Sequence, residues 1–148
     1  VVPLGLVAAV TGRPRAVPTS PGDAQASAAR ARAAVMEVER ALGFEPTDRE
    51  FERLGYDIES RVPGTGRLRF IEVKGRATEG DIALTENEFK TAQRLKDDYW
   101  LYVVYHCASG SPQVHRIQNP ARLGWKPVVQ VEHYRLSAAA VTAAKDAQ

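Results

Sequence analysis

Hydrophobic and polar residues follow patterns that predict several β-strands. Arg67–Gly75 has an apolar centre rich in β-branched residues with glycine on both sides, which is typical of a strand. Tyr99–Tyr105 is aromatic and β-branched almost throughout, so it predicts a central strand covered on both faces. Shorter runs of the same kind predict strands near 55–62 and 113–118, and a last strand or extended segment over 128–136.

Two longer segments have the hydrophobic periodicity of helices and residues that are typical of helix ends. The first should begin at Ser20, which can cap a helix, and stop at Gly43. Its apolar residues share one stripe: Ala28, Ala31, Val35, Val38 and Leu42. The second should begin at Thr85, because Glu88 follows three residues later as in a capping box, and should run to about residue 96. An alanine-rich helical tail is expected over 137–145.

The predicted elements follow the order α-β-β-α-β-β, which indicates an α/β protein with a mixed sheet and helices packed on it. Residues 44–52 are a polar connection that can hold a short strand. We expect an N-terminal arm or linker over 1–19, in which 1–10 is either a strand or an apolar arm. A domain over 20–136 and the helical tail over 137–148 follow it.

The run from Pro63 to Gly66 predicts a hairpin turn between the strands on its two sides. If the loop is Gly64-Thr65 in a type II′ turn, Pro63 pairs with Gly66. Counting back along both strands places Asp57 opposite Glu72. A slip of one residue would turn Asp57 to the other face of the sheet.

Glu72 and Lys74 are two residues apart on a predicted strand, so their side chains project from the same face. Burying a carboxylate and an ammonium side by side is costly, so a buried strand does not usually contain both on one face. Asp57 opposite Glu72 would add a second carboxylate and like-charge repulsion. A divalent cation between them would turn that repulsion into a set of ligands.

Composition narrows the class of protein. The 148 residues are 44% hydrophobic and 26% charged, which indicates one globular domain with a core, and no apolar run has the length of a membrane span. The net charge of +2 and the pI near 8.8 permit a nucleic-acid partner without requiring one. A single cysteine, Cys107, excludes an internal disulfide and suits a reducing cytoplasm. Because the chain begins Val-Val, we expect a C-terminal piece of a larger protein.

An acidic residue followed after a spacer by Glu72-Val73-Lys74 resembles the active-site pattern of the PD-(D/E)XK nuclease superfamily. A second acid-x-lysine string, Glu88-Phe89-Lys90, lies on a predicted helix, where spacing two does not place side chains on one face. We therefore interpret it as a chance match.

A closer resemblance covers about residues 30–136. It is carried by Gly55-Tyr56-Asp57-Ile58, Phe70–Arg76, Leu84–Glu88, Tyr99–Val104 and Asn119-Pro120. These motifs resemble the C-terminal domain family of the plant protein NO VEIN, whose bacterial members are often attached to larger proteins, including helicases. The resemblance implies a restriction-endonuclease-like fold.

The resemblance and the chemistry together give each residue an expected role. Asp57, Glu72 and the backbone carbonyl of Val73 would hold Mg²⁺ or Mn²⁺, and Lys74 would orient the attacking water or stabilise charge on the phosphate. Glu39 resembles the first-helix glutamate of the superfamily and would either contact the groups that bind the metal or bind a second metal ion. The remaining expected contacts, to DNA phosphates or near the site, are Arg67, Arg69, Arg76 and Gln93.

The function that follows is a Mg²⁺-dependent DNA endonuclease module of a helicase-like, DNA-processing or defence protein in the bacterial cytoplasm, the nucleoid included. Two alternatives stay open on the same fold: an inactive module that binds nucleic acid, and a protein-interaction domain. A third interpretation is that Asp57, Glu72 and Lys74 form a structural ion-pair cluster.

Overall fold

The computed structural model describes residues 21–129 and 131–145 of the chain. The chain divides into two units, and Pro18–Trp125, here called the sheet domain, contains the whole β-sheet. The other unit includes the described residues that follow Trp125. The predicted start of the first helix at Ser20 and the expected strand or arm over 1–10 lie outside the described residues.

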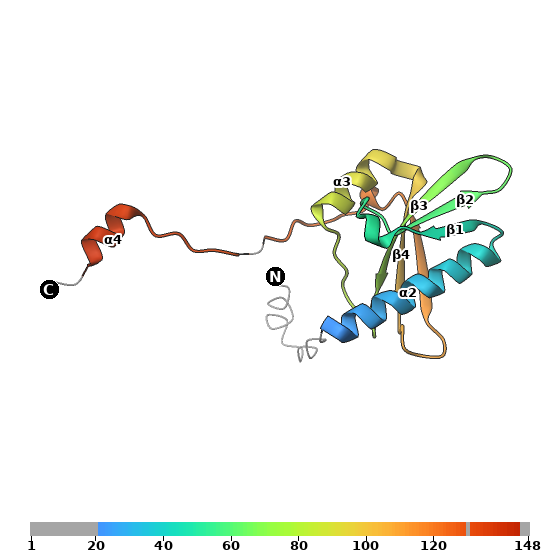
Figure 1. Cartoon of the computed structure of the whole chain (residues 1–148), viewed down its shortest axis with the longest axis horizontal. Helices are drawn as coiled ribbons and strands as arrows, with labels where there is room; N and C mark the ends of the chain where they lie inside the picture. Colours follow the sequence, from blue (N-terminus) through green and yellow to red (C-terminus); the bar gives the residue numbers. More distant parts are fainter. Residues whose placement is uncertain (1–20, 130, 146–148) are drawn as a thin grey trace. The chain divides into compact units, whose positions relative to one another are not determined.

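The sheet domain is built on five strands, which Figure 1 shows with the helices around them. Their bounds are β1 Glu45–Asp48, β2 Ile58–Val62, β3 Arg67–Gly75, β4 Tyr99–Tyr105 and β5 Gln113–Gln118. The strands lie in the order β1-β2-β3-β4-β5, and every neighbouring pair is antiparallel except β3 and β4, which are parallel. The mixed α/β fold is therefore confirmed, with β1 as an additional short strand in the polar connection.

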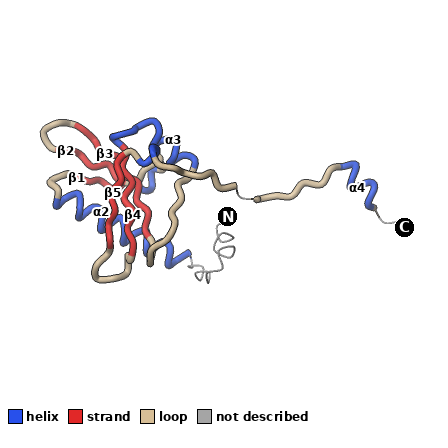
Figure 2. Tube along the Cα trace, turned by 180° about the vertical axis from the view of Figure 1, so that it is seen from behind, coloured by secondary structure: helices blue, strands red, loops and turns tan. Residues whose placement is uncertain are grey.

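Helix α2, Pro21–Ala41, packs across one face of the sheet, here called the α2 face. The helix crosses the strands in Figure 1 and is seen behind them in Figure 2. Its stripe packs Ala31 and Val35 into a core with Ile71, Val73 and Tyr102. Burial of these side chains is the main stabilisation of the contact. Gly75 allows the close approach, because an added Cβ would lie 2.6 Å from the Cβ of Ala31.

Helix α3, Glu86–Leu95, lies in the connection between the parallel strands β3 and β4. Thr85 and Glu88 form the predicted capping box, in which each side chain accepts a hydrogen bond from the other residue's backbone N–H. Side chains alternate along β3, and Lys74, which contacts α3, is one residue out of phase with Val73, which contacts α2. Helices α2 and α3 therefore cover opposite faces, and the second is here called the α3 face.

The hairpin has the predicted register but a different turn. Ile58 pairs with Ile71 and Val62 with Arg67, which is the register that sets Asp57 opposite Glu72. The turn closes one residue earlier than expected, with a 3.3 Å hydrogen bond from Thr65 N–H to the Val62 carbonyl. Gly64 has φ +80°, as the third residue of a type II turn requires, so Pro63 and Gly64 form the turn in place of Gly64-Thr65.

The segment after Trp125 adds no strand in the part that the structure describes. Residues 128, 129 and 131–136 are irregular and exposed, so the expected last strand is wrong for the described residues: a strand requires a ladder partner, and none of these residues pairs with the sheet. The helical tail forms as α4, Ala138–Ala144. Among the described residues no helix has the length and apolarity needed to cross a membrane.

Candidate active site

Asp57, Glu72 and Lys74 lie together on the α3 face of the sheet. Glu72 and Lys74 project from this face of β3, and Asp57 precedes β2 at the position opposite Glu72. Two hydrogen bonds to β3 hold Asp57: its backbone N–H donates to the Ile71 carbonyl at 2.8 Å, and its Oδ2 accepts from the Val73 N–H at 2.9 Å. The hairpin register is thus what brings the second carboxylate to the first.

Glu72 is an incompletely paired buried carboxylate. It is 2% exposed, and its Oε2 lies 3.1 Å from the Nζ of Lys74. Its Oε1 is buried without a hydrogen-bond partner. An unpaired oxygen on a buried carboxyl group is expensive and calls for a partner, such as a proton, an ion or a water.

Glu88 joins this cluster from helix α3. Its Oε1 accepts a hydrogen bond from the Nζ of Lys74 at 2.9 Å, so Lys74 lies between Glu72 and Glu88. From the sequence, Glu88 is expected only as a capping residue within a chance motif. Lys74 retains 24% side-chain exposure and Glu88 17%, so the cluster opens to solvent at these two groups.

The crowding of three carboxylates around one ammonium changes their protonation. Burial raises the pKa of Glu72 to about 9; the charges of Asp57 and Glu88 add to the shift and Lys74 opposes it. Burial also raises the pKa of Asp57, against the hydrogen bond from Val73. Burial works against the charged forms of Lys74 and Glu88 as well. Their neighbours outweigh it, so the pKa of Lys74 is raised and that of Glu88 is lowered.

Helix α3 makes a close contact with the segment that precedes Asp57. Gly55 has φ +88°, and a Cβ built on it would lie 2.3 Å from the Oγ1 of Thr91. The hydroxyl of Tyr99 donates to the Gly55 carbonyl at 2.7 Å. Glycine is therefore required both by the backbone conformation and by the space, and it lets α3 approach Asp57 closely.

The carboxylates of Asp57 and Glu72 can supply part of the ligand set of a hard cation. Asp57 and Glu72 supply oxygen ligands, and the unpartnered Oε1 of Glu72 is an oxygen that a cation would satisfy. Within the described ranges, no three His, Cys, Asp or Glu side chains are placed to hold a metal by themselves. A bound ion would need further oxygens, such as the Val73 carbonyl, water or substrate, as Mg²⁺ commonly does.

The structure does not bring Glu39 to this cluster. Glu39 is fully buried on the α2 face, where its carboxylate accepts hydrogen bonds from Arg69 and from the hydroxyl of Tyr102. Arg69 is also engaged there, with its guanidinium carbon 4.3 Å from the ring centre of Trp100 and 4.6 Å from that of Phe44. The predicted roles of Glu39 at a second metal and of Arg69 at a phosphate therefore have no support from this placement.

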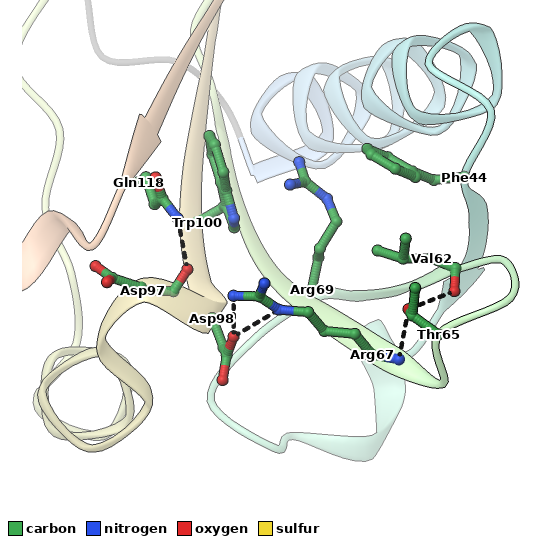
Figure 3. A pocket seen from close by; sticks show the side chains of 9 residues that line it. All are labelled: Phe44, Val62, Thr65, Arg67, Arg69, Asp97, Asp98, Trp100 and Gln118. Atoms are coloured by element: carbon green, nitrogen blue, oxygen red, sulfur yellow. Dashed lines mark hydrogen bonds and ion pairs between the residues drawn. The ribbon is translucent and has the colours of Figure 1, made fainter.

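Arg69 points into a pocket of about 280 Å³ on the α2 face (Figure 3). Its lining residues are Phe44, Val62, Thr65, Arg67, Arg69, Asp97, Asp98, Trp100 and Gln118. The pocket is separated from the Asp57 cluster by the sheet, because Arg69 and Trp100 project from the opposite face to Glu72.

The other predicted phosphate contacts are dispersed. Arg67 pairs with Asp98 at 3.0 Å in the lining of that pocket, and Arg76 donates to the Asp81 carbonyl at 2.8 Å in the loop after β3. Gln93 is exposed on α3. The structure therefore gathers Asp57, Glu72 and Lys74 with Glu88, and none of the predicted arginines has a contact to them.

Comparison with known proteins gives one match. The family described as Protein NO VEIN, C-terminal, matches residues 28–117, which is more than half of the chain and includes every residue of the cluster. No curated protein and no solved structure matches the chain.

Proposed function

The chain belongs to the NO VEIN C-terminal family, and from that premise we propose that it is a divalent-metal-dependent DNA endonuclease domain of the PD-(D/E)XK type. One observation carries the proposal: two carboxylates face each other across neighbouring strands, one of them has a buried unpaired oxygen, and a lysine lies beside it. This is the arrangement that the acid, spacer and acid-x-lysine pattern would produce on a hairpin. A restriction-endonuclease-like core and a place as the C-terminal module of a helicase-like parent are parts of the same proposal.

Asp57 and Glu72 would hold Mg²⁺ or Mn²⁺, with the Val73 carbonyl as a further ligand. The cation, when bound, supplies Lewis-acid activation of the scissile phosphate and of a water molecule. The chain itself supplies the fixed geometry. The Val73 N–H holds Asp57 in place, and Lys74 presents an ammonium 3.1 Å from Glu72, where it can stabilise negative charge on a phosphate or orient water.

A plasmid-nicking assay tests the proposal. Supercoiled DNA is incubated with Mg²⁺, with Mn²⁺ or with EDTA, and three variants are compared with the native chain. Asp57→Asn keeps an acceptor for the Val73 N–H and Lys74→Ala removes the ammonium, so each should reduce metal-dependent nicking on the order of hundredfold or more. Lys90→Ala is the matched control, since Lys90 is an exposed lysine on α3 that pairs only with Glu86 among the described residues. It should nick like the native chain.

The other outcomes discriminate among the alternatives. Equal nicking by all four proteins would contradict the assignment of Asp57 and Lys74. DNA binding without cleavage in either metal would favour an inactive nucleic-acid-binding module. Binding of neither DNA nor RNA at low salt would favour a protein-interaction domain.

A further inference from the structure

One carboxylate oxygen of Glu88 has two tasks. Its Oε1 accepts the Thr85 backbone N–H at 2.9 Å, which closes the capping box of α3, and it accepts the Nζ of Lys74 at 2.9 Å. The same atom therefore joins the first turn of α3 to the lysine of β3. A capping glutamate needs only the first of these contacts, so the second requires its own explanation.

We propose that Glu88 is the positioning residue for Lys74, an inference that rests on the proposed nuclease function. A lysine ammonium has three N–H donors on a flexible four-carbon stem. Glu88, on the facing helix, accepts a hydrogen bond from this ammonium, and Glu72, on the same strand, lies 3.1 Å from it as an ion-pair partner. The ammonium is held from two directions, and one N–H is left for a phosphate oxygen or the attacking water.

Glu88 can hold Lys74 because α3 itself is fixed. The capping box orders its first turn, and Thr91 packs against Gly55 one helical turn further on. Glu88 and Lys74 are both largely shielded, at 17% and 24% side-chain exposure, so their contact is screened less than a surface ion pair. Glu88 thus transmits the position of the helix to the site.

Two substitutions separate the capping task from the positioning task. Glu88→Gln keeps an acceptor for the Thr85 N–H, because glutamine also serves at this capping position, but it removes the charge that holds Lys74. Thr85→Ala removes the capping hydroxyl and leaves the Glu88 carboxylate. Glu86→Gln is the matched control for loss of a carboxylate from the first turn, because Glu86 lies two residues before Glu88 and is exposed.

For Glu88→Gln we expect kcat of plasmid nicking to fall ten- to hundredfold at unchanged KM, because a misplaced group costs rate, with a fall in Tm of a few degrees from the lost contact to Lys74. For Thr85→Ala we expect Tm to fall by about 5 °C while kcat per folded protein is kept. Glu86→Gln should change neither. Native kcat in Glu88→Gln, or an equal loss of kcat in Thr85→Ala, would overturn the inference.

A second measurement does not depend on cleavage. In a double-mutant cycle of Glu88→Gln and Lys74→Met, followed by urea unfolding at one pH in EDTA, we expect the two changes to be coupled about tenfold in the unfolding equilibrium constant. A coupling below twofold overturns the inference. If the native chain cleaves no DNA, the proposed function fails, and the cycle alone then decides whether Glu88 holds Lys74.

Discussion

The structure gives its most complete quantitative prediction for the substitution Glu72→Gln. Burial raises the pKa of Glu72 from the ordinary 4.5 to about 9, with Asp57 adding to the shift. The folded protein therefore holds this proton more tightly than the unfolded chain. The stability that the proton contributes is complete below about pH 4.5 and is lost as the pH rises toward 9.

The magnitude follows from linkage. Each pH unit in this window costs about 1.4 kcal/mol, so the native chain at pH 7 should be less stable than at pH 4.5 by about 3 kcal/mol from this residue alone. Glutamine has the shape of the neutral acid and does not ionise. Glu72→Gln should therefore raise the free energy of unfolding at pH 7 by up to about 3 kcal/mol, or Tm by roughly 10 °C.

The assay is urea unfolding of both proteins in EDTA from pH 5 to pH 8. We expect the stability of the native chain to fall with pH and that of Glu72→Gln to fall much less, with the two curves converging near pH 5. Added Mg²⁺ should stabilise the native chain and have little effect on the variant, because the cation takes the place of the proton. Glu86→Gln, which removes an exposed carboxylate of α3, should behave like the native chain. Parallel pH curves for the native chain and Glu72→Gln would refute the reasoning.

Three further substitutions test the structure on the two faces of the sheet. Gly55→Ala should lower the free energy of unfolding by about 1–3 kcal/mol from its φ of +88°, with an added clash 2.3 Å from Thr91 Oγ1; a stable variant in urea unfolding would contradict this. Arg69→Met leaves the buried Glu39 carboxylate without its cation, so it should cost about 3–5 kcal/mol in the same assay yet leave nicking per folded protein unchanged. Lys90→Ala should alter neither stability nor nicking, and a loss of nicking would show that the chance motif has a role.

The strands and the hairpin register could be predicted because their signals are local. Glycine and proline at 63–66 fix where the chain turns, and counting from the turn determines which residues face each other. The exact turn type differed, since Pro63 and Gly64 suit a type II turn one residue earlier. The pairing of Val62 with Arg67 was the same in either case.

The place of Glu39 could not be predicted, because a helical stripe does not say which face of a sheet the helix covers. Glu39 does project from α2 toward the sheet, as its position beside the apolar stripe indicated. The helix covers the face from which Arg69 projects, and Glu72 projects from the other. Because neighbouring residues of β3 point to opposite faces, Glu39 and the cluster lie on opposite sides of the sheet.

Glu88 was missed although a signal was present. Thr85-x-x-Glu88 marks the start of a helix that follows directly after the strand carrying Lys74. If that helix crosses over to a parallel strand, its first turn begins near the end of the preceding strand, which is where Lys74 lies. The parallel pairing of β3 with β4 was not visible in the sequence, so the carboxylate could not be assigned to the cluster.

The central claim is that Asp57 and Glu72 together hold a divalent cation, and the most direct test is a crystal of the chain soaked with Mn²⁺. We predict an anomalous difference peak roughly 2.0–2.3 Å from carboxylate oxygens of both Asp57 and Glu72, and its loss in Glu72→Gln. Anomalous peaks elsewhere but none between these two residues, at a Mn²⁺ concentration that supports nicking, would contradict the account.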